Sequence, residues 1–262
     1  MAKGEMAGFL EIDGRRVEVA RFGRQGGTTL VFLHEGLGCA AAWRDFPAAL
    51  AEATGCAALV YSRFGYGRSS PAPLPRPASF MHEEAHRFLP AVLDAAGVKD
   101  ALLVGHSDGA SIALLHAAEE QVRVRGLLLE APHVFVEPVC VEAIAVLQAA
   151  YPGSKLQEKL AQRHDDADAM VGGWTEVWLS QAFRSWNIES VLPSVRAPVL
   201  VIQGSADEYG TLAQVEAVCS QVGGPSERLI LDGVGHAPHR DRPGEVLAEM
   251  AAFVRRVLRA PS

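Results

Sequence analysis

The stretch that most constrains the fold of this chain is residues 101–115, where an apolar run meets Gly105-His106-Ser107-Asp108-Gly109 and a helical pattern follows. This order predicts a buried strand, a sharp turn that carries Ser107, and a helix. A strand and a helix pass this closely only where side chains are small, and Gly105 and Gly109 meet that need. The helix start would point its free N–H groups at an anion formed at Ser107. Ser107 is therefore a candidate nucleophile; the alternative is a tight turn with an incidental serine.

Apolar runs of strand length recur along the chain and alternate with helical patterns. Besides the run before Ser107, they occupy residues 29–33, 57–61, 124–129, 198–203 and 227–231. Such runs are typical of a parallel sheet that is covered by helices on both faces. Residues 9–20 alternate apolar and polar side chains across Asp13-Gly14, which predicts an antiparallel hairpin. We therefore expect an α/β fold with a mostly parallel central sheet.

The strand pattern is interrupted between residues 134 and 193, where only helical stretches occur. We interpret this segment as a helical lid, 134–193, inserted in a core domain formed by residues 1–133 and 194–262. In open α/β sheets ligands bind at the carboxyl ends of the strands, so the lid is expected to cover that edge.

Charge and cysteine content limit the expected partners and location. The chain has 24 Lys and Arg against 31 Asp and Glu, a net charge of −7, which disfavours binding to nucleic acid or an anionic membrane. The four cysteines form no C-x-x-C pair, and no apolar run is long enough to span a membrane or to form a leader. We expect a cytoplasmic protein that binds a small-molecule substrate. Nothing in the sequence argues against a homodimer.

A serine nucleophile needs a base and an acid that orients the base. Asp207 follows one predicted strand, His236 follows the next, and the order Ser…Asp…His is the order of the α/β-hydrolases. Glu130, which also ends a strand, is the alternative acid, and His239 is the alternative base. We favour Asp207 because its loop comes one strand before His236.

Five motifs in order carry a family resemblance: His34-Glu35-Gly36-Leu37-Gly38, Gly65-Tyr66-Gly67-Arg68-Ser69, Gly105-His106-Ser107-Asp108-Gly109, Gly204-Ser205-Ala206-Asp207 and Gly235-His236. The whole chain resembles lid-bearing serine esterases of the α/β-hydrolase superfamily. The resemblance implies that Ser107 attacks a carbonyl carbon, that His236 moves the proton and that Asp207 orients His236. It also disfavours an epoxide hydrolase or a dehalogenase, because those relatives carry Asp where Ser107 stands.

The resemblance further implies an oxyanion hole formed by the backbone N–H groups of Gly36 and Asp108. Glu35 departs from the family pattern, which has glycine there, and Asp108 adds a second acid. Two carboxylates beside a developing negative charge would oppose catalysis unless they are neutralised. We therefore expect Arg63 or His34 to pair with one of them.

Several further side chains are candidates for contact with substrate. They are His34, Glu35, His106, His133, Trp174, Trp178, Trp186 and Tyr209. The alternative for the tryptophans is that they pack the lid onto the sheet.

The segment His82-Glu83-Glu84-Ala85-His86 matches the H-E-x-x-H zinc signature. Leu89 and Val92 stand where the extended signature has Gly and His, and we interpret the segment as the polar face of an ordinary helix. We expect neither a metal nor an organic cofactor.

The sequence thus predicts a serine hydrolase that cleaves a small, apolar or aromatic carboxylic ester through an acyl-enzyme. A thioesterase, a C–C bond hydrolase of aromatic catabolism, and a non-catalytic small-ligand receptor are the alternatives, because the same three residues occur in each.

Overall fold

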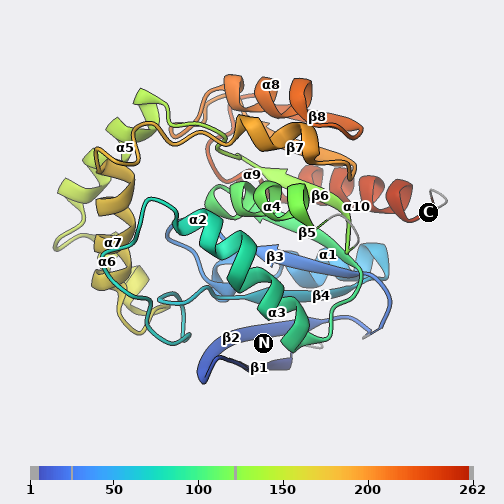
Figure 1. Ribbon diagram of the computed structural model, residues 1–262, viewed down its shortest axis with the longest axis horizontal. Coiled ribbons are helices and arrows are strands. Elements are labelled where there is room, and N and C mark those ends of the chain that lie inside the picture. Colours follow the sequence, from blue (N-terminus) through green and yellow to red (C-terminus); the bar gives the residue numbers. More distant parts are fainter. Residues whose placement is uncertain (1–5, 25, 121–122, 260–262) are drawn as a thin grey trace.

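The computed structural model describes residues 6–24, 26–120 and 123–259, and the described strands form one sheet (Figure 1). Its order is β1-β2-β4-β3-β5-β6-β7-β8. The strands are β1 Met6–Ile12, β2 Arg15–Phe22, β3 Thr29–Leu33, β4 Ala57–Tyr61, β5 Ala101–His106, β6 Val124–Glu130, β7 Val199–Gly204 and β8 Ser226–Leu231. β2 pairs antiparallel with β1 and with β4, and every other pairing is parallel. The predicted fold class, with its opening hairpin, is confirmed.

Helices cover both faces of this sheet (Figure 1). The helices that precede β6 in the chain are η1 Ala40–Trp43, α1 Phe46–Thr54, α2 Phe80–Glu83, η2 Glu84–Phe88, α3 Leu89–Ala96 and α4 Asp108–Glu119. The later ones are α5 Pro138–Ala150, α6 Lys155–Ala161, α7 Ala167–Leu179, η3 Glu189–Ser194, α8 Leu212–Gln221, α9 Pro238–Asp241 and α10 Pro243–Arg259.

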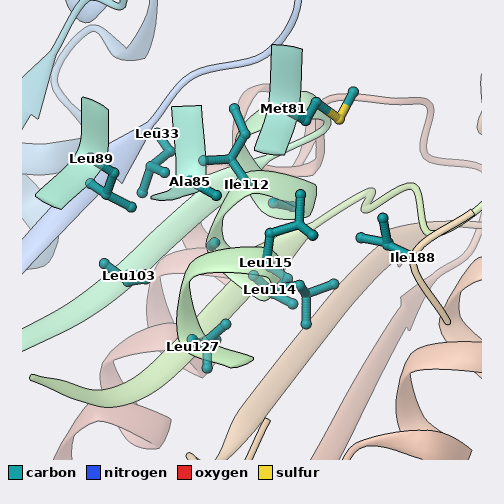
Figure 2. Packing of buried hydrophobic residues seen from close by; sticks show 14 of the residues in the cluster. Leu33, Met81, Ala85, Leu89, Leu103, Ile112, Leu114, Leu115, Leu127 and Ile188 are labelled. Carbon is teal, nitrogen blue, oxygen red and sulfur yellow. The ribbon is translucent and has the colours of Figure 1, made fainter. Parts of the chain in front are cut away.

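The core is divided between the two faces because successive strand residues point to opposite sides. Leu102 and Val104 of β5 belong to the cluster that packs against α1 and α10. Leu103 belongs to the cluster on the other face, where Ile112 and Leu115 of α4 meet the sheet (Figure 2). Both faces of β5 are therefore buried, and the end of this strand lies in the middle of the sheet.

The helical segment formed by α2, η2 and α3 changes its hydrogen-bond pattern before Pro90. One π-helical turn, η2, separates α2 from α3, and Pro90 lies in the first turn of α3. Proline has no N–H to donate to the preceding turn, so the hydrogen-bond pattern changes at this point instead of continuing regularly.

Helices α5, α6 and α7 lie together at one end of the molecule, between β6 and β7 in the chain (Figure 1). The flanks of this segment meet in a bridge between Phe135 and Asn187. That residues 134–193 form a lid inserted in a core domain of residues 1–133 and 194–262 stays a prediction. No helix among the described residues is both long and apolar enough to cross a membrane.

Candidate active site

Ser107 lies at the sharp turn between β5 and α4, with φ 54° and ψ −121°. This left-handed backbone is rare and strained for a residue with a side chain. The strand and the helix can pass this closely because glycines stand two positions before and after Ser107. A Cβ on Gly109 would lie 2.1 Å from the Leu33 carbonyl oxygen, and one on Gly105 would lie 2.6 Å from the Ala110 Cα.

His236 and Asp207 meet beside the carboxyl ends of β7 and β8. Nδ1 of His236 lies 2.9 Å from both carboxylate oxygens of Asp207. The Tyr209 N–H and the Gln203 amide also donate to this carboxylate, each at 2.8 Å. Burial would raise the pKa of Asp207, but the hydrogen bond from His236 and the backbone bond from Tyr209 hold it below its usual value. Asp207 is thus an acceptor for the Nδ1 proton, which leaves His236 Nε2 as the proton-accepting atom.

Two further histidines lie against His236. His106 Nε2 is 2.7 Å from the carbonyl oxygen of His236, so the residue before Ser107 contacts the backbone of His236. The ring of His133 is centred 5.8 Å from that of His236. Burial and the neighbouring His236 lower the pKa of His133 to about 3, so His133 is neutral near pH 7.

The alternative acid and the alternative base pair with each other. Oε2 of Glu130 accepts hydrogen bonds from the backbone N–H of His239 at 2.9 Å and from its Nδ1 at 3.0 Å. Both side chains are almost fully buried, and neither lines the cavity at Ser107. Sequence reasoning considered these two residues singly and missed the pair, although both follow strands whose ends lie at the same edge of the sheet.

Ser107 and His236 open into one cavity of about 550 Å³. The predicted contact residues on its wall are Glu35, His106, His133, Trp174, Trp178 and Tyr209. The helices α5 and α6 add an apolar sector formed by Cys140, Ile144, Leu147, Leu156 and Leu160. Charged residues also line the cavity: Arg44, Lys159, Arg163, Glu208, Arg240 and Asp241.

Two predicted contact residues do not line this cavity. The ring of His34 is used within the protein: Nδ1 lies 2.7 Å from the Glu35 carbonyl oxygen, and Nε2 accepts from the Arg63 N–H at 3.1 Å. Trp186 stacks on Phe183 in the hydrophobic core, with ring centroids 5.2 Å apart. Each side chain is therefore turned to a packing or hydrogen-bonding partner and away from the substrate space.

Both unexpected carboxylates near Ser107 have cationic partners. Glu35 pairs with Arg240 at 2.7 Å, and His106 Nδ1 lies 3.6 Å from its other oxygen. Asp108 lies 3.7 Å from the Arg63 guanidinium and accepts a hydrogen bond from the Trp174 indole at 2.9 Å. Arg63 thus pairs with one of the two carboxylates, as expected, and that carboxylate is Asp108. Arg240, the partner of Glu35, was not predicted.

The backbone N–H of Gly36 lies in the loop after β3, and that of Asp108 lies at the start of α4, directly after Ser107. In the described part of the chain, neither makes a loop or turn hydrogen bond to another backbone group. Both are therefore available as donors to an anion at Ser107.

The H-E-x-x-H segment lies elsewhere. The rings of His82 and His86 are 6.0 Å apart, and His86 pairs with Glu119 at 2.9 Å. Neither histidine lines the cavity at Ser107. Within the described ranges, no group of three or more His, Cys, Asp or Glu side chains is placed to hold a metal ion.

Known proteins resemble this chain in sequence and in fold. The model of a family described as the alpha/beta hydrolase family matches residues 30–250. The chain is 25% identical to epoxide hydrolase A of Mycobacterium tuberculosis, over 94% of this chain and 96% of the relative. It is 29% identical to a putative carbamate hydrolase, RutD, of Variovorax paradoxus, over 73% and 77% of the two chains. In fold it is similar to a serine hydrolase of the polyaromatic hydrocarbon-degrading bacterium Cycloclasticus zankles, with a TM-score of 0.78 and 17% identity over 98% and 100% of the chains.

Proposed function

The chain belongs to the alpha/beta hydrolase family and is a hydrolase of that type; we propose that it cleaves a carboxylic ester through an acyl-enzyme on Ser107. One observation carries the proposal: Ser107, at its strained turn, and His236, bound to Asp207, line the same cavity. A serine hydroxyl becomes a nucleophile at neutral pH when a neutral imidazole can take its proton.

Each residue then has one role in the reaction. Ser107 Oγ attacks the ester carbonyl carbon while His236 Nε2 accepts the hydroxyl proton. The negative charge that develops on the carbonyl oxygen is bound by the N–H groups of Gly36 and Asp108. His236 then donates its proton to the departing alcohol, and Asp207 stabilises the imidazolium throughout. A water molecule releases the acid by the same steps, with His236 again as the base.

The wall of the cavity supports an apolar substrate. Ile144, Leu147 and Leu156 come from the helices over the site, and Trp174 and Trp178 add two aromatic rings. Apolar walls with a few convergent polar groups are typical of small-molecule sites. Thioesters and lactones would pass through the same acyl-enzyme, so the bond that is cleaved must be identified with a set of matched substrates.

An epoxide is not supported as the substrate, although one relative is named an epoxide hydrolase. Attack by a serine hydroxyl on an epoxide carbon would leave an ether, which has no carbonyl for water to attack. A carboxylate nucleophile would leave a hydrolysable ester, but residue 107 is a serine.

The test is labelling with a fluorophosphonate probe, together with hydrolysis of p-nitrophenyl esters, acyl-CoA thioesters and lactones. We expect the wild type to be labelled and active, and Ser107→Ala to lose both. Ser220→Ala, an exposed site on α8, is the matched control and should retain both. Activity that survives Ser107→Ala would refute the mechanism. Absence of labelling with tight binding of a small apolar ligand would indicate a receptor.

A further inference from the structure

The indole of Trp174 contacts both residues that would donate to the oxyanion. Trp174 lies on α7, and its side chain is buried. Its N–H donates to Asp108 Oδ2 at 2.9 Å. The same ring lies directly against Gly36, since a Cβ built on that glycine would be only 2.2 Å from the indole nitrogen. One side chain of α7 thus touches both residues from which the oxyanion hole would be formed.

The carboxylate of Asp108 needs this hydrogen bond. The side chain is fully buried, and its Oδ1 has no hydrogen-bond partner among the described residues. Burial raises the pKa of Asp108, and the Arg63 charge and the Trp174 hydrogen bond oppose that rise. A buried carboxylate without such partners would repel a second negative charge that forms at the neighbouring Ser107.

Arg63 cannot provide this compensation alone. Its guanidinium donates to the carbonyl oxygens of His34 at 2.8 Å and Glu35 at 3.2 Å, and it lies 3.7 Å from Asp108. The distance to Asp108 is beyond a hydrogen bond, so the guanidinium acts there through its charge alone. Among the described residues, Trp174 supplies the hydrogen bond that orients the Asp108 carboxylate.

We propose that Trp174 is a positioning residue of the oxyanion hole, which holds the Asp108 carboxylate and supports Gly36. This inference rests on the proposed function, because it concerns the charge that forms when Ser107 attacks a carbonyl. It also ties activity to the seating of α7, since withdrawal of the helix would remove both contacts at once.

The test replaces Trp174 by phenylalanine, which keeps an aromatic ring and removes the N–H. We expect kcat to fall about ten-fold to hundred-fold, the range for loss of a hydrogen bond to a charged group, with KM changed less than about three-fold. The affinity for an alkyl boronic acid, whose tetrahedral adduct carries the negative charge, should fall by a similar factor. Trp186→Phe is the matched control, because Trp186 lies outside the cavity, and it should leave both values unchanged.

A double variant separates positioning from packing. Trp174→Phe combined with Asp108→Asn removes the carboxylate that needs the indole. Asp108→Asn alone is the reference for this double variant. In the Asp108→Asn background, Trp174→Phe should change kcat and boronate affinity less than about three-fold, against about ten-fold or more in the wild-type background. Equal losses in the two backgrounds, or no loss in a folded Trp174→Phe, would overturn the inference.

The two proposals fail in different ways. If the wild type is labelled at Ser107 and loses activity in Ser107→Ala, but Trp174→Phe retains its kcat and boronate affinity, only the role of Trp174 is wrong. If the wild type neither reacts with the probe nor hydrolyses any ester, the proposed function is wrong and the inference falls with it.

Discussion

Glu84 is buried in the π-helical turn η2, and its carboxyl should make the stability of this protein fall as pH rises from about 4.5 toward neutrality. Its side chain is almost fully buried, and its Oε2 has no hydrogen-bond partner among the described residues. Burial raises the pKa of Glu84 to about 7, against the opposing charges of Arg63 and Arg76. In the folded protein this group therefore keeps a proton that the unfolded chain has already released.

The size of the effect follows from the pKa difference. A rise from 4.5 to about 7 corresponds to about 3 kcal/mol, at about 1.4 kcal/mol for each pH unit. Below about pH 4.5 both states are protonated and the contribution to stability is fully present. It is lost progressively as pH rises from about 4.5 to about 7, because the unfolded chain releases this proton while the folded protein retains it, and the loss is complete once the folded group also ionises. For a chain of this length the loss amounts to about 6–12 °C in Tm.

The substitution that tests this is Glu84→Gln, since a neutral amide resembles the protonated carboxyl in shape. Thermal unfolding, followed by circular dichroism between pH 5 and 8.5, should show wild type losing stability relative to the variant as pH rises. Glu83→Gln is the control: Glu83 is the preceding residue but is exposed, so its variant should follow wild type. Equal pH slopes for wild type and Glu84→Gln would refute the reasoning.

Two further predictions concern the partner of His236 and the turn at Ser107. Asp207→Asn should lower kcat about 10³-fold or more in ester hydrolysis, because an amide can hold His236 in the wrong tautomer. Glu130→Gln should lower kcat less than about ten-fold, and equal losses in the two variants would contradict the assignment of Asp207 as the acid. Gly109→Ala should destabilise the fold by about 3 kcal/mol or more, because its Cβ would overlap the Leu33 carbonyl. Gly172→Ala, where a Cβ meets nothing within 4 Å on helix α7, should instead stabilise by about 0.5–1 kcal/mol in the same urea titration.

Most of the fold could be predicted because the signals are local. The buried strands and their order of appearance follow from apolar runs, and the small residues around Ser107 predict the turn that the structure shows. The π-helical turn before Pro90 was not predicted, since a missing N–H indicates that a helix is disturbed but not how the chain adapts.

The site was harder to predict because it depends on which side chains meet. Order along the chain favoured Asp207 as the partner of His236, and the structure places those two side chains in contact. Composition could not show that Trp186 packs in the core while Trp174, twelve residues earlier, reaches the cavity. The two differ only in which neighbours surround them after folding.

The sequence by itself determined that this chain forms a mostly parallel sheet covered by helices on both faces, with a serine at a sharp strand–helix turn. Hydrophobic periodicity and glycine placement act over a few residues, so they can be recognised in the sequence. Only the tertiary structure decided how the acidic side chains beside that serine are compensated. Glu35 meets Arg240 and Asp108 meets Trp174, pairs separated by 205 and 66 positions. Such partners are selected by burial, which makes an unpaired carboxylate costly and so requires a donor from whichever segment the fold brings near.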